Sequence, residues 1–514
     1  MAKIKGIPII FTSNSTEMSD FNEDPFIAFT GGFPKYVTMW HGHPPVEHDE
    51  NGAKFAPYGM RKIQAILLEN GFKEEDMITT HPKYLNRFIG PETKIVAIST
   101  MDPLALAYVD LTYSAFIGMG EPTNALEFRR LLLKQKSFKK FNPKVVLGGA
   151  GAWQIANKKA MDYLGVDHVI IGESELTVVD VFSKLMQNKE VPPIIQSKSP
   201  PEESIIPIKH PVIHGGVELS RGCGRNCQFC SPTMRKRRDI PINYILKEVE
   251  TNVRGGSRMI TLITEDLLLY GCKSLKFIPN EEAVCELCKG IASFKAVKYI
   301  QPVHISLAAV CATPNLIPKL TDIFWDHSID QIRGRYHIHG KQIMSAETGI
   351  ESGSPRIIEK YMKGKPLPFT PKEWPEIVIQ SMGILNDNDW LPLASFLLDM
   401  PDETEDDTLK TIELVDELKH YNVFLMPVLF VPLGDCILRN ERKADWSAIS
   451  RASKDLFIRC WQNNAETYKE DYLKGFRRYI VSFMVGGLYY GYYFWKDARK
   501  DYNRFLKNIA GISV

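Results

Sequence analysis

The first part of the chain alternates short apolar runs with amphipathic stretches. Continuous apolar, β-branched runs are typical of strands buried on both faces of a parallel sheet, and three occur here: 94–100, 144–151 and 167–173. Apolar residues at helical spacing predict three helices: 58–71, 124–138 and 175–186. This alternation predicts a doubly wound α/β domain over 51–186, preceded by an irregular segment over 1–50.

A proline-rich stretch over 187–212 follows this domain and predicts an extended linker. After it, the alternation of strand and helix patterns restarts. Six strand candidates follow, most of them separated by helical stretches: 216–222, 258–264, 304–310, 342–349, 393–400 and 424–431. Parallel strands with crossover helices predict a partial (β/α) barrel over 213–436, with its chemistry at the carboxyl ends of the strands. The region 437–514 is helical in pattern, basic and aromatic.

Composition narrows the class of protein. A chain of 514 residues is too long for one ordinary core, and 44% hydrophobic with 24% charged residues is typical of a soluble globular protein. A net charge of +2 gives no electrostatic reason to expect a nucleic-acid partner. The first residues lack the apolar run of a secretory signal, so we expect a cytoplasmic protein in a reducing compartment. In that compartment, clustered cysteines indicate metal binding or catalysis.

Three of the nine cysteines lie within eight residues. Cys223, Cys227 and Cys230 follow the first strand candidate of the barrel at the spacing C-x3-C-x2-C. Iron–sulfur clusters are held by thiolates in such close-spaced runs, and three ligands leave one iron of a four-iron cluster open. A structural zinc site with a distant fourth ligand, or three unrelated cysteines, is the alternative. The position directly after a barrel strand favours an active site.

The segment from Cys223 to Cys230 resembles the signature of radical S-adenosylmethionine (SAM) enzymes. The resemblance implies that Cys223, Cys227 and Cys230 hold a [4Fe–4S] cluster. It also implies that the amine and carboxylate of SAM occupy the open iron, and that the aromatic Phe229 lies near the adenine.

Further elements of this family follow in order along the barrel. ITED, with Glu265, resembles the second-strand element that contacts the methionine amino group. SAETGIESGS, with Glu347 and Ser352, resembles the fourth-strand element near the ribose and carboxylate of SAM. FLLDMPDET resembles the fifth-strand turn, but Asp399 and Asp402 replace the usual glycines. The backbone there is in question, because glycine permits conformations that are costly for aspartate. PVLFVPLGD resembles the ending of the sixth strand.

A doubly wound domain ahead of such a barrel is similar to the cobalamin-dependent branch of the family. The resemblance implies a Rossmann-like domain whose loops beyond the strand ends hold the nucleotide tail of cobalamin. In this chain those positions are Ser99, Thr100, Gly148, Gly149, Gly172 and Glu173. A Rossmann-like domain with another role is the alternative, because glycine after a strand is common in α/β proteins.

The sequence offers no residue that can be assigned as the axial ligand of cobalt. The chain lacks the D-x-H-x-x-G motif with which many cobalamin proteins supply histidine to the metal. Tyr108 and Tyr113 lie in the 101–120 segment that would face cobalt, but packing is the preferred interpretation of both.

The resemblance implies a C-methyltransferase. In this branch an electron enters the cluster and splits SAM, the resulting radical removes hydrogen from an unactivated sp3 carbon, and methylcobalamin delivers the methyl group. The layout is similar to that of the archaeal enzyme that methylates a glutamine of methyl-coenzyme M reductase. We therefore expect a protein or peptide substrate and an electron-donor protein as partners. A lipid or isoprenoid substrate and a non-catalytic cobalamin-binding protein are the alternatives. A methylthiotransferase is disfavoured, because no cysteine precedes Cys223.

Two of the remaining cysteines form a second C-x-x-C. Cys285 and Cys288 lie on a stretch whose apolar stripe favours core packing. The alternative is an auxiliary metal cluster completed by Cys272 and Cys311.

Two further segments have competing interpretations. The basic run over 233–239 is interpreted as a solvated helix start, with docking of an acidic electron donor or an anionic group as the alternative. The uncharged aromatic stretch over 479–495 favours a cap on the barrel over membrane contact, because a spanning helix needs about 20 apolar residues.

Overall fold

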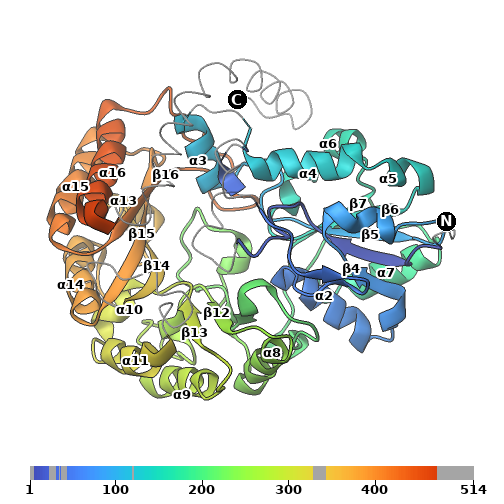
Figure 1. Ribbon diagram of the computed structural model, residues 1–514. Helices are drawn as coiled ribbons and strands as arrows, with labels where there is room; N and C mark the ends of the chain where they lie inside the picture. The colour runs from blue at the N-terminus through green and yellow to red at the C-terminus, as the bar shows by residue number, and fades with distance from the viewer. Residues whose placement is uncertain are drawn as a thin grey trace. The chain divides into compact units, whose positions relative to one another are not determined.

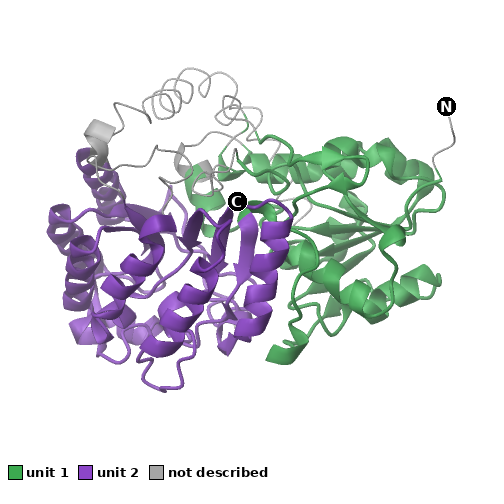
Figure 2. Cartoon of the chain, turned by 60° about the horizontal axis from the view of Figure 1, so that its bottom comes forward, with its two compact units in different colours: residues 1–214, 481–514 green, residues 215–480 purple. Residues whose placement is uncertain are grey.

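The computed structural model describes residues 5–21, 31–33, 35, 43–117, 121–327 and 343–471. These residues form two compact units that divide between His214 and Gly215 (Figures 1 and 2). We call the described residues up to His214 unit 1 and those from Gly215 unit 2. The aromatic stretch expected to cap the barrel, 479–495, lies outside the described residues. Within them, no helix has both the length and the apolar character that crossing a membrane requires.

Unit 1 is built on a six-stranded parallel sheet with the order β4-β1-β5-β6-β7-β8 (Figure 1). The strands are β1 Ile9–Thr12, β4 Met77–Thr79, β5 Ile95–Ser99, β6 Lys144–Gly148, β7 His168–Ile171 and β8 Ile194–Gln196. Ile9 and Ile10 of β1 enter two different hydrophobic cores, because successive residues of a strand point to opposite faces of the sheet.

Helices cover both faces of this sheet. They are α2 Tyr58–Glu69, α3 Tyr108–Ile117, α4 Thr123–Lys134, α5 Lys136–Phe141, α6 Lys158–Leu164 and α7 Val178–Met186. The apolar stripes of α2 and α7 join the core of Ile9, whereas those of α4 and α6 join the core of Ile10. The doubly wound α/β architecture expected from the sequence is confirmed.

Two expectations for unit 1 were wrong in part. Residues Ile9–Thr12, placed in the irregular segment 1–50, form an inner strand with four buried side chains. The apolar run is only a few residues long, and partners far along the chain decide its pairing. The linker expected over 187–212 contains strand β8, which pairs with β7 at the edge of the sheet. An edge position tolerates the prolines that precede β8.

A short antiparallel pair lies outside the main sheet of unit 1. It consists of β2 (His48–Asp49) and β3 (Gly52–Ala53). Arg61 of α2 donates hydrogen bonds to the carbonyl oxygens of Ala53 and Lys54, both at 2.8 Å, and so fixes this pair to the helix.

Unit 2 contains six further parallel strands in two groups of three. One group has the order β13-β12-β9 and the other β14-β15-β16. Their bounds are β9 Gly216–Glu218, β12 Met259–Ile263, β13 Tyr299–Pro302, β14 Met344–Glu351, β15 Trp390–Leu398 and β16 Phe424–Leu429. Backbone hydrogen bonds join the groups: Glu347 N donates to Val303 O at 2.6 Å, and Ile305 N donates to Glu347 O at 3.0 Å. The partial barrel is therefore confirmed.

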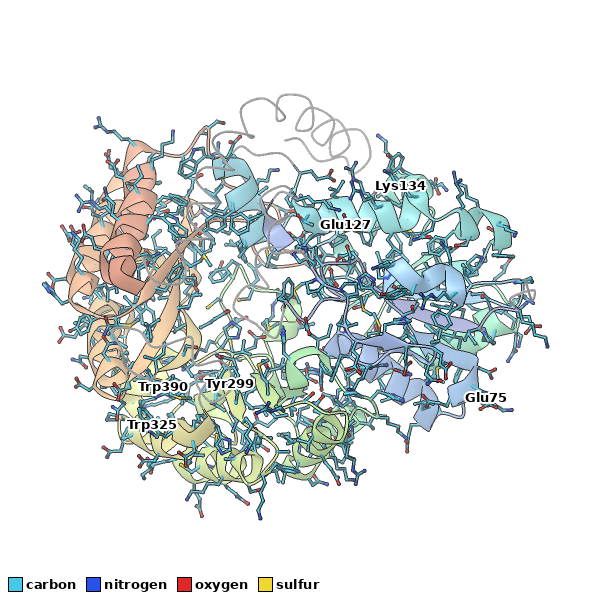
Figure 3. All side chains as sticks on the ribbon, in the orientation of Figure 1. Glu75, Glu127, Lys134, Tyr299, Trp325 and Trp390 are labelled. Carbon is cyan, nitrogen blue, oxygen red and sulfur yellow. The ribbon has the colours of Figure 1, made fainter. Side chains whose placement is uncertain are left out.

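Helices alternate with these strands along the chain. They are α8 Ile242–Arg254, α9 Glu281–Ala292, α10 Leu307–Ala312, α11 Leu316–Phe324, α13 Pro355–Tyr361, α14 Trp374–Asp387, α15 Glu405–Glu417 and α16 Arg451–Asp471. At the amino ends of β13 and β15, Tyr299 and Trp390 are buried (Figure 3). The indole nitrogen of Trp390 donates to Thr321 Oγ1 of α11 at 2.8 Å, which ties the strand to the helix layer.

The third barrel strand was expected at 304–310, and this was wrong. The strand is Tyr299–Pro302, and Leu307–Ala312 forms helix α10. Both segments are apolar and buried, and periodicity alone does not separate a buried strand from a buried helix over so few residues.

Candidate active site

The cysteine loop leaves the carboxyl end of β9 and is closed by a short antiparallel pair. Strand β10 (Ser220–Arg221) pairs with β11 (Arg238–Asp239), so residues 222–237 form a closed excursion. Gly222 has φ 73°, and a Cβ there would lie 2.4 Å from the carbonyl oxygen of Lys236. Glycine is required at this position, because any side chain would meet both a strained backbone and a clash.

The thiols of Cys223, Cys227 and Cys230 influence one another inside this loop. A hydrogen bond with Cys230 lowers the pKa of Cys227, and the same bond raises the pKa of Cys230. Burial raises the pKa of Cys223 to about 11. Among the described residues, no three His, Cys, Asp or Glu side chains converge on a position for a single metal ion. A cubane cluster needs no such position, because each of its cysteines binds a different iron.

Arg225, between the first two cysteines, fastens the loop to the rest of unit 2. Its guanidinium donates to the carbonyl oxygens of Gly364, Lys365 and Leu367 at 3.2, 2.9 and 2.8 Å. It also donates to Ser306 Oγ at 3.1 Å and lies 3.9 Å from Asp266 Oδ2. The side chains of Arg225 and Asp266 are only 4% and 1% exposed, so this is a buried ion pair. The planar fork of arginine suits such a multiple contact.

A second buried cation, Lys365, approaches the cysteines from the segment after α13. Its Nζ lies 3.2 Å from Oε1 of Glu351 on β14. Burial lowers the pKa of Lys365, but the charges of Glu351 and Cys227 more than offset this, and the net shift is upward. Gly349 leaves room for the pair, because a Cβ there would lie 2.0 Å from Glu351 Oε1. Neither Lys365 nor Arg225 was expected at the site from the sequence.

Polar side chains gather at the carboxyl ends of β12, β13 and β14. Glu265 is exposed just beyond β12, and Glu347 is exposed on β14. His304, which the sequence analysis missed, lies between them: its Nε2 is 3.2 Å from Glu347 Oε2, and its Nδ1 is 3.1 Å from the carbonyl oxygen of Thr264. Burial lowers the pKa of His304, but Glu347, Glu265 and Thr264 outweigh it and raise the pKa to about 9.

Two of the predicted SAM-contacting residues are buried. Phe229 is 7% exposed and Ser352 is 1% exposed. Ser352 Oγ lies 3.3 Å from Thr411 Oγ1 of α15, and the backbone N–H of Ser354 donates to Ser352 Oγ at 3.1 Å. In this structure Ser352 organises the end of β14, whereas the side chain of Glu347 is 53% exposed and available to a ligand.

The turn after β15 keeps a glycine-like backbone although it contains aspartates. Asp399 has φ 62° and Asp402 has φ 55°, both in the left-handed region. That conformation costs a non-glycine residue roughly 1–2 kcal/mol. Both side chains form ion pairs: Asp402 Oδ2 lies 2.6 Å from Lys360 Nζ, and Asp399 Oδ2 lies 3.4 Å from Arg442 Nη2. Asp399 and Asp402 therefore adopt the left-handed backbone that glycine would adopt at these two positions.

The predicted cobalamin positions of unit 1 lie at one edge of its sheet. The chain leaves β1 for β4 on one side and continues from β5 to β6 on the other, so a topological switch point lies between β1 and β5. Ligands of doubly wound sheets bind beyond the strand ends at such a point. The six positions follow the ends of β5, β6 and β7: Ser99, Thr100, Gly148, Gly149, Gly172 and Glu173.

Backbone, rather than side chains, is accessible at this edge. A Cβ on Gly148 would meet nothing within 4 Å, and Gly149 is exposed with φ 97°. By contrast, the hydroxyl of Thr100 is engaged with Glu17 at 3.3 Å, and Oε1 of Glu173 accepts from Ser199 Oγ at 2.7 Å. An open glycine edge fits a ligand that approaches the backbone closely.

The loop after β1 also contributes polar side chains to this edge, which was not expected from the sequence. Four donors converge on the carboxylate of Glu17: Ser13 Oγ, Asn14 Nδ2, Thr100 Oγ1 and Met101 N, at 2.9, 3.0, 3.3 and 2.9 Å. Burial raises the pKa of Glu17 to about 7, although these hydrogen bonds lower it. The network ties the loop after β1 to the end of β5 across the switch point. Its signal in the sequence was the polar run SNSTE directly after the apolar IIFT.

Tyr113, one of the two tyrosines considered for cobalt, is 3% exposed. Its ring packs against Phe33, with the centroids 5.6 Å apart. Packing therefore explains this residue, as the sequence analysis preferred.

The other cysteines have separate surroundings. Cys288 is fully buried on the core face of α9, as expected. Cys311 Sγ lies 3.2 Å from Ser381 Oγ of α14, and Cys272 Sγ donates to the carbonyl oxygen of Ile278 at 3.1 Å. Cys272 and Cys311 thus each contact their own neighbours through hydrogen bonds.

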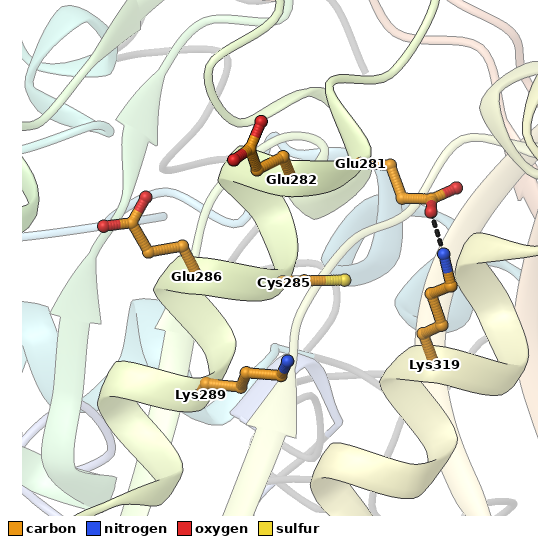
Figure 4. A pocket seen from close by; sticks show the side chains of 6 residues that line it. All are labelled: Glu281, Glu282, Cys285, Glu286, Lys289 and Lys319. Atoms are coloured by element: carbon orange, nitrogen blue, oxygen red, sulfur yellow. Dashed lines mark hydrogen bonds and ion pairs between the residues drawn. The ribbon is translucent and has the colours of Figure 1, made fainter.

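Cys285 lies on the outer face of α9, where it lines a surface pocket (Figure 4). The other lining residues are Glu281, Glu282, Glu286, Lys289 and Lys319. Glu281 and Lys319 form an ion pair across the pocket.

Curated relatives align over part of the chain. No protein-family model matches it. The tRNA-2-methylthio-N(6)-dimethylallyladenosine synthase of Methylacidiphilum infernorum is 25% identical over 306 residues, which cover 57% of this chain and 60% of that protein. The ribosomal protein uS12 methylthiotransferase RimO of Stenotrophomonas maltophilia is 27% identical over 128 residues, 23% of this chain and 28% of that protein. The chain therefore matches less than two thirds of the length of either relative.

Solved structures resemble more of the chain. The radical S-adenosylmethionine methyltransferase TsrM from Kitasatospora setae, with tryptophan and a SAM analog bound, superimposes with a TM-score of 0.52 at 12% sequence identity. The match covers 83% of this chain and 75% of TsrM. TsrM with cobalamin and a [4Fe–4S] cluster bound gives a TM-score of 0.50. The chain shares the fold of this methyltransferase.

Proposed function

We propose that this chain is a radical SAM C-methyltransferase that uses cobalamin. One observation carries the proposal: three mutually interacting thiols leave the first strand of a six-stranded parallel barrel beside the buried cations Arg225 and Lys365. Cys223, Cys227 and Cys230 would hold the [4Fe–4S] cluster, and the two cations offset the negative charge of its thiolates.

The chain's own residues then bind and orient the cofactors. Glu265 and Glu347, both exposed at the strand ends, would accept hydrogen bonds from the amino group and ribose hydroxyls of SAM. Phe229 would contact the adenine. The glycine edge of unit 1, at Gly148 and Gly149, would accommodate the nucleotide tail of cobalamin. The bound cofactors supply the radical and the methyl group, while the protein supplies position and shields the reaction from water.

For the substrate we propose a protein side chain. The resemblance found in the sequence makes a glutamine of methyl-coenzyme M reductase the specific case to test. An electron-donor protein and a reducing, cytoplasmic setting complete the proposal. A glutamine-containing peptide from that reductase, incubated with the reconstituted protein, a reductant and labelled SAM, should gain one methyl group. An unmodified peptide alongside SAM cleavage would remove this substrate but keep the cofactor assignment.

The experiment that tests the cofactor assignment is anaerobic reconstitution with iron, sulfide and cobalamin, followed by metal counting and electron paramagnetic resonance. About four irons and one cobalt per chain are expected, as for a single four-iron cluster. Cys230→Ala should lose the cluster and SAM cleavage yet retain cobalt. Cys285→Ala, which removes a thiol from the surface pocket, is the matched control and should retain both metals. Full iron binding in Cys230→Ala would overturn the cluster assignment.

A methylthiotransferase is the second candidate, because the two curated relatives carry that activity in their names. Against it, residues 1–222 contain no cysteine that could hold a second cluster in the α/β domain. A second cluster would raise the iron content to about eight per chain. Mass spectrometry separates the two activities, because methylthiolation adds a sulfur atom to the product and methylation does not.

A further inference from the structure

Asp399 and Asp402 share a strained backbone, but local contacts explain only one of them. Both lie in the left-handed region, with φ 62° and 55°, where glycine would carry no side-chain penalty. Strain of this kind persists where the surroundings or the function of the site require the side chain. The two carboxylates are therefore compared by the partners that each of them has.

Local partners account for Asp402. Its Oδ2 lies 2.6 Å from Lys360 Nζ and accepts a hydrogen bond from the hydroxyl of Tyr361 at 3.1 Å. The hydrogen bonds with Lys360 and Tyr361 lower the pKa of Asp402. The side chain is 68% exposed, so water reaches it as well. Asp402 thus ties the turn after β15 to α13, and its carboxylate is fully satisfied there.

Local partners do not account for Asp399. Its side chain is only 25% exposed, and Oδ2 makes one long contact, 3.4 Å from Nη2 of Arg442. Oδ1 accepts no hydrogen bond from another residue that the structure describes. Burial raises the pKa of Asp399, and Arg442 offsets this only in part. A largely buried carboxylate with one weak partner is costly unless a further donor meets it.

The position of Asp399 places this carboxylate at the open end of the barrel. It directly follows β15, whose Ser395 donates to Glu351 Oε2 at 3.2 Å. Glu351 in turn pairs with Lys365, which approaches the cysteines. A strand rises about 3.3 Å per residue, so β15 continues about 10 Å beyond Ser395 before the turn begins. The active site of a (β/α) barrel opens at that end.

The turn holds Asp399 beside an arginine that has donors to spare. Oε2 of Glu403 accepts from the backbone N–H of Met400 at 3.0 Å, and Glu403 N donates to Met400 O at 3.1 Å, so the turn is fixed from within. Arg442 comes from the segment after β16, and its side chain is 69% exposed. A guanidinium carries five N–H groups, of which the contact with Asp399 uses one.

We infer that Asp399 and Arg442 recognise a primary carboxamide of the substrate. A carboxamide has N–H donors and a carbonyl acceptor on neighbouring atoms. Oδ1 of Asp399 accepts from the amide nitrogen, and the guanidinium of Arg442 donates to the amide oxygen. The inference rests on the proposed function, and it assigns the side-chain specificity of that site to two residues.

The charges of this pair decide between the substrate groups that it could bind. Asp399 and Arg442 together carry no net charge, so they suit a neutral group. Arg442 would repel a cationic side chain, and Asp399 would repel a carboxylate. A hydroxyl would satisfy only one of the two residues at a time. A carboxamide satisfies both, and a site built to hydrogen-bond such a group rejects analogues that lack it.

The test measures the binding of two peptides to the reconstituted full chain with SAM. One peptide carries the glutamine of methyl-coenzyme M reductase, and the other has glutamate at that position. Fluorescence anisotropy gives both dissociation constants. The wild-type protein should bind the glutamine peptide about tenfold or more tightly. Asp399→Asn removes the charge and introduces an N–H donor on a residue that tolerates this backbone, so it should reverse the preference.

Asp402→Asn is the matched control, because it makes the same change on the same kind of backbone where the side chain faces Lys360. It should keep the wild-type preference. Asp399→Gly checks for a merely structural role. Glycine relieves the backbone strain, so the melting temperature should not fall, yet the preference for glutamine should disappear.

Three outcomes would overturn the inference: an unchanged preference in Asp399→Asn, equal affinity of the wild-type protein for both peptides, or binding of neither peptide. Release of 5′-deoxyadenosine from SAM by the same wild-type sample separates these outcomes from a failure of the proposed function. If 5′-deoxyadenosine is released, the cofactor assignment stands although the carboxamide site does not. If none is released, the proposed function itself fails.

Discussion

Nε2 of His304 lies 3.2 Å from Oε2 of Glu347, and this pair closes the seam between the two halves of the barrel. The strand groups β13-β12-β9 and β14-β15-β16 meet at the isolated bridge between the same two residues. Both ring nitrogens of His304 face acceptors, namely Glu347 and the carbonyl oxygen of Thr264. An imidazole with two acceptors is favoured in its doubly protonated form, because each nitrogen must then donate.

The first prediction concerns the titration of His304. With the pKa raised from 6.5 to about 9, the ion pair contributes fully below pH 6.5 and its contribution is lost as the pH rises through 9. Nuclear magnetic resonance of the apoprotein, labelled at histidine nitrogens, should show both His304 nitrogens protonated at neutral pH. Glu347→Gln should shift the midpoint down towards 6.5, because it removes the partner charge. A wild-type midpoint near 6.5 would contradict the pairing.

The second prediction concerns Arg225. Replacing it with glutamine leaves three carbonyl oxygens without their buried donor and Asp266 without its buried counter-ion. Breaking a buried pair in this way should lower the free energy of unfolding of unit 2 by about 3 kcal/mol, measured by urea denaturation. The matched control is Arg254→Gln, which breaks an exposed pair with Glu250 and should cost less than about 1 kcal/mol. Equal losses in the two variants would show that Arg225 does not anchor the loop.

The third prediction concerns the glycine edge of unit 1. Gly149→Val places a Cβ 2.5 Å from the carbonyl oxygen of Thr100 on a backbone with φ 97°. This should reduce the cobalamin retained after gel filtration several-fold, because the edge must move. Gly165→Asn is the control: its φ is 70°, nothing lies within 4 Å, and asparagine tolerates this conformation. Unchanged cobalamin in Gly149→Val would place that ligand elsewhere.

The fourth prediction concerns Glu17 and pH. Burial raises its pKa from 4.5 to about 7, so the folded protein binds a proton that the unfolded chain has already released. Stability should therefore fall as the pH rises from about 5 to about 8, since the carboxylate must then be buried with its charge. Glu17→Gln removes this charge and should flatten the profile of melting temperature against pH. Parallel profiles for the two proteins would contradict the raised pKa, because they would show that the hydrogen bonds to Glu17 fully offset the effect of burial.

Local patterns in the sequence predicted much of this architecture. The apolar run of β5 and the glycines after β6 indicated a buried parallel sheet, because strands covered on both faces need no polar face. The spacing of Cys223, Cys227 and Cys230 indicated a cluster loop, because a single short segment is enough to bring three thiols together. Apolar residues at helical spacing likewise predicted helices α2 and α7, whose apolar faces pack into one hydrophobic core.

Only the tertiary structure decided which elements meet. Strand β1 became an inner strand because β4 and β5, more than sixty residues away, pair with its two edges. The segment expected as a strand over 304–310 lies beyond the end of β13 and enters helix α10, and the backbone of Ile305 donates to Glu347 before that helix begins. The partners of three buried or half-buried cations lie far away in the sequence: Lys365 O for Arg225, Glu351 for Lys365 and Glu347 for His304. Spacing along the chain determines short-range geometry, whereas burial and charge pairing depend on contacts that form only when the strands assemble.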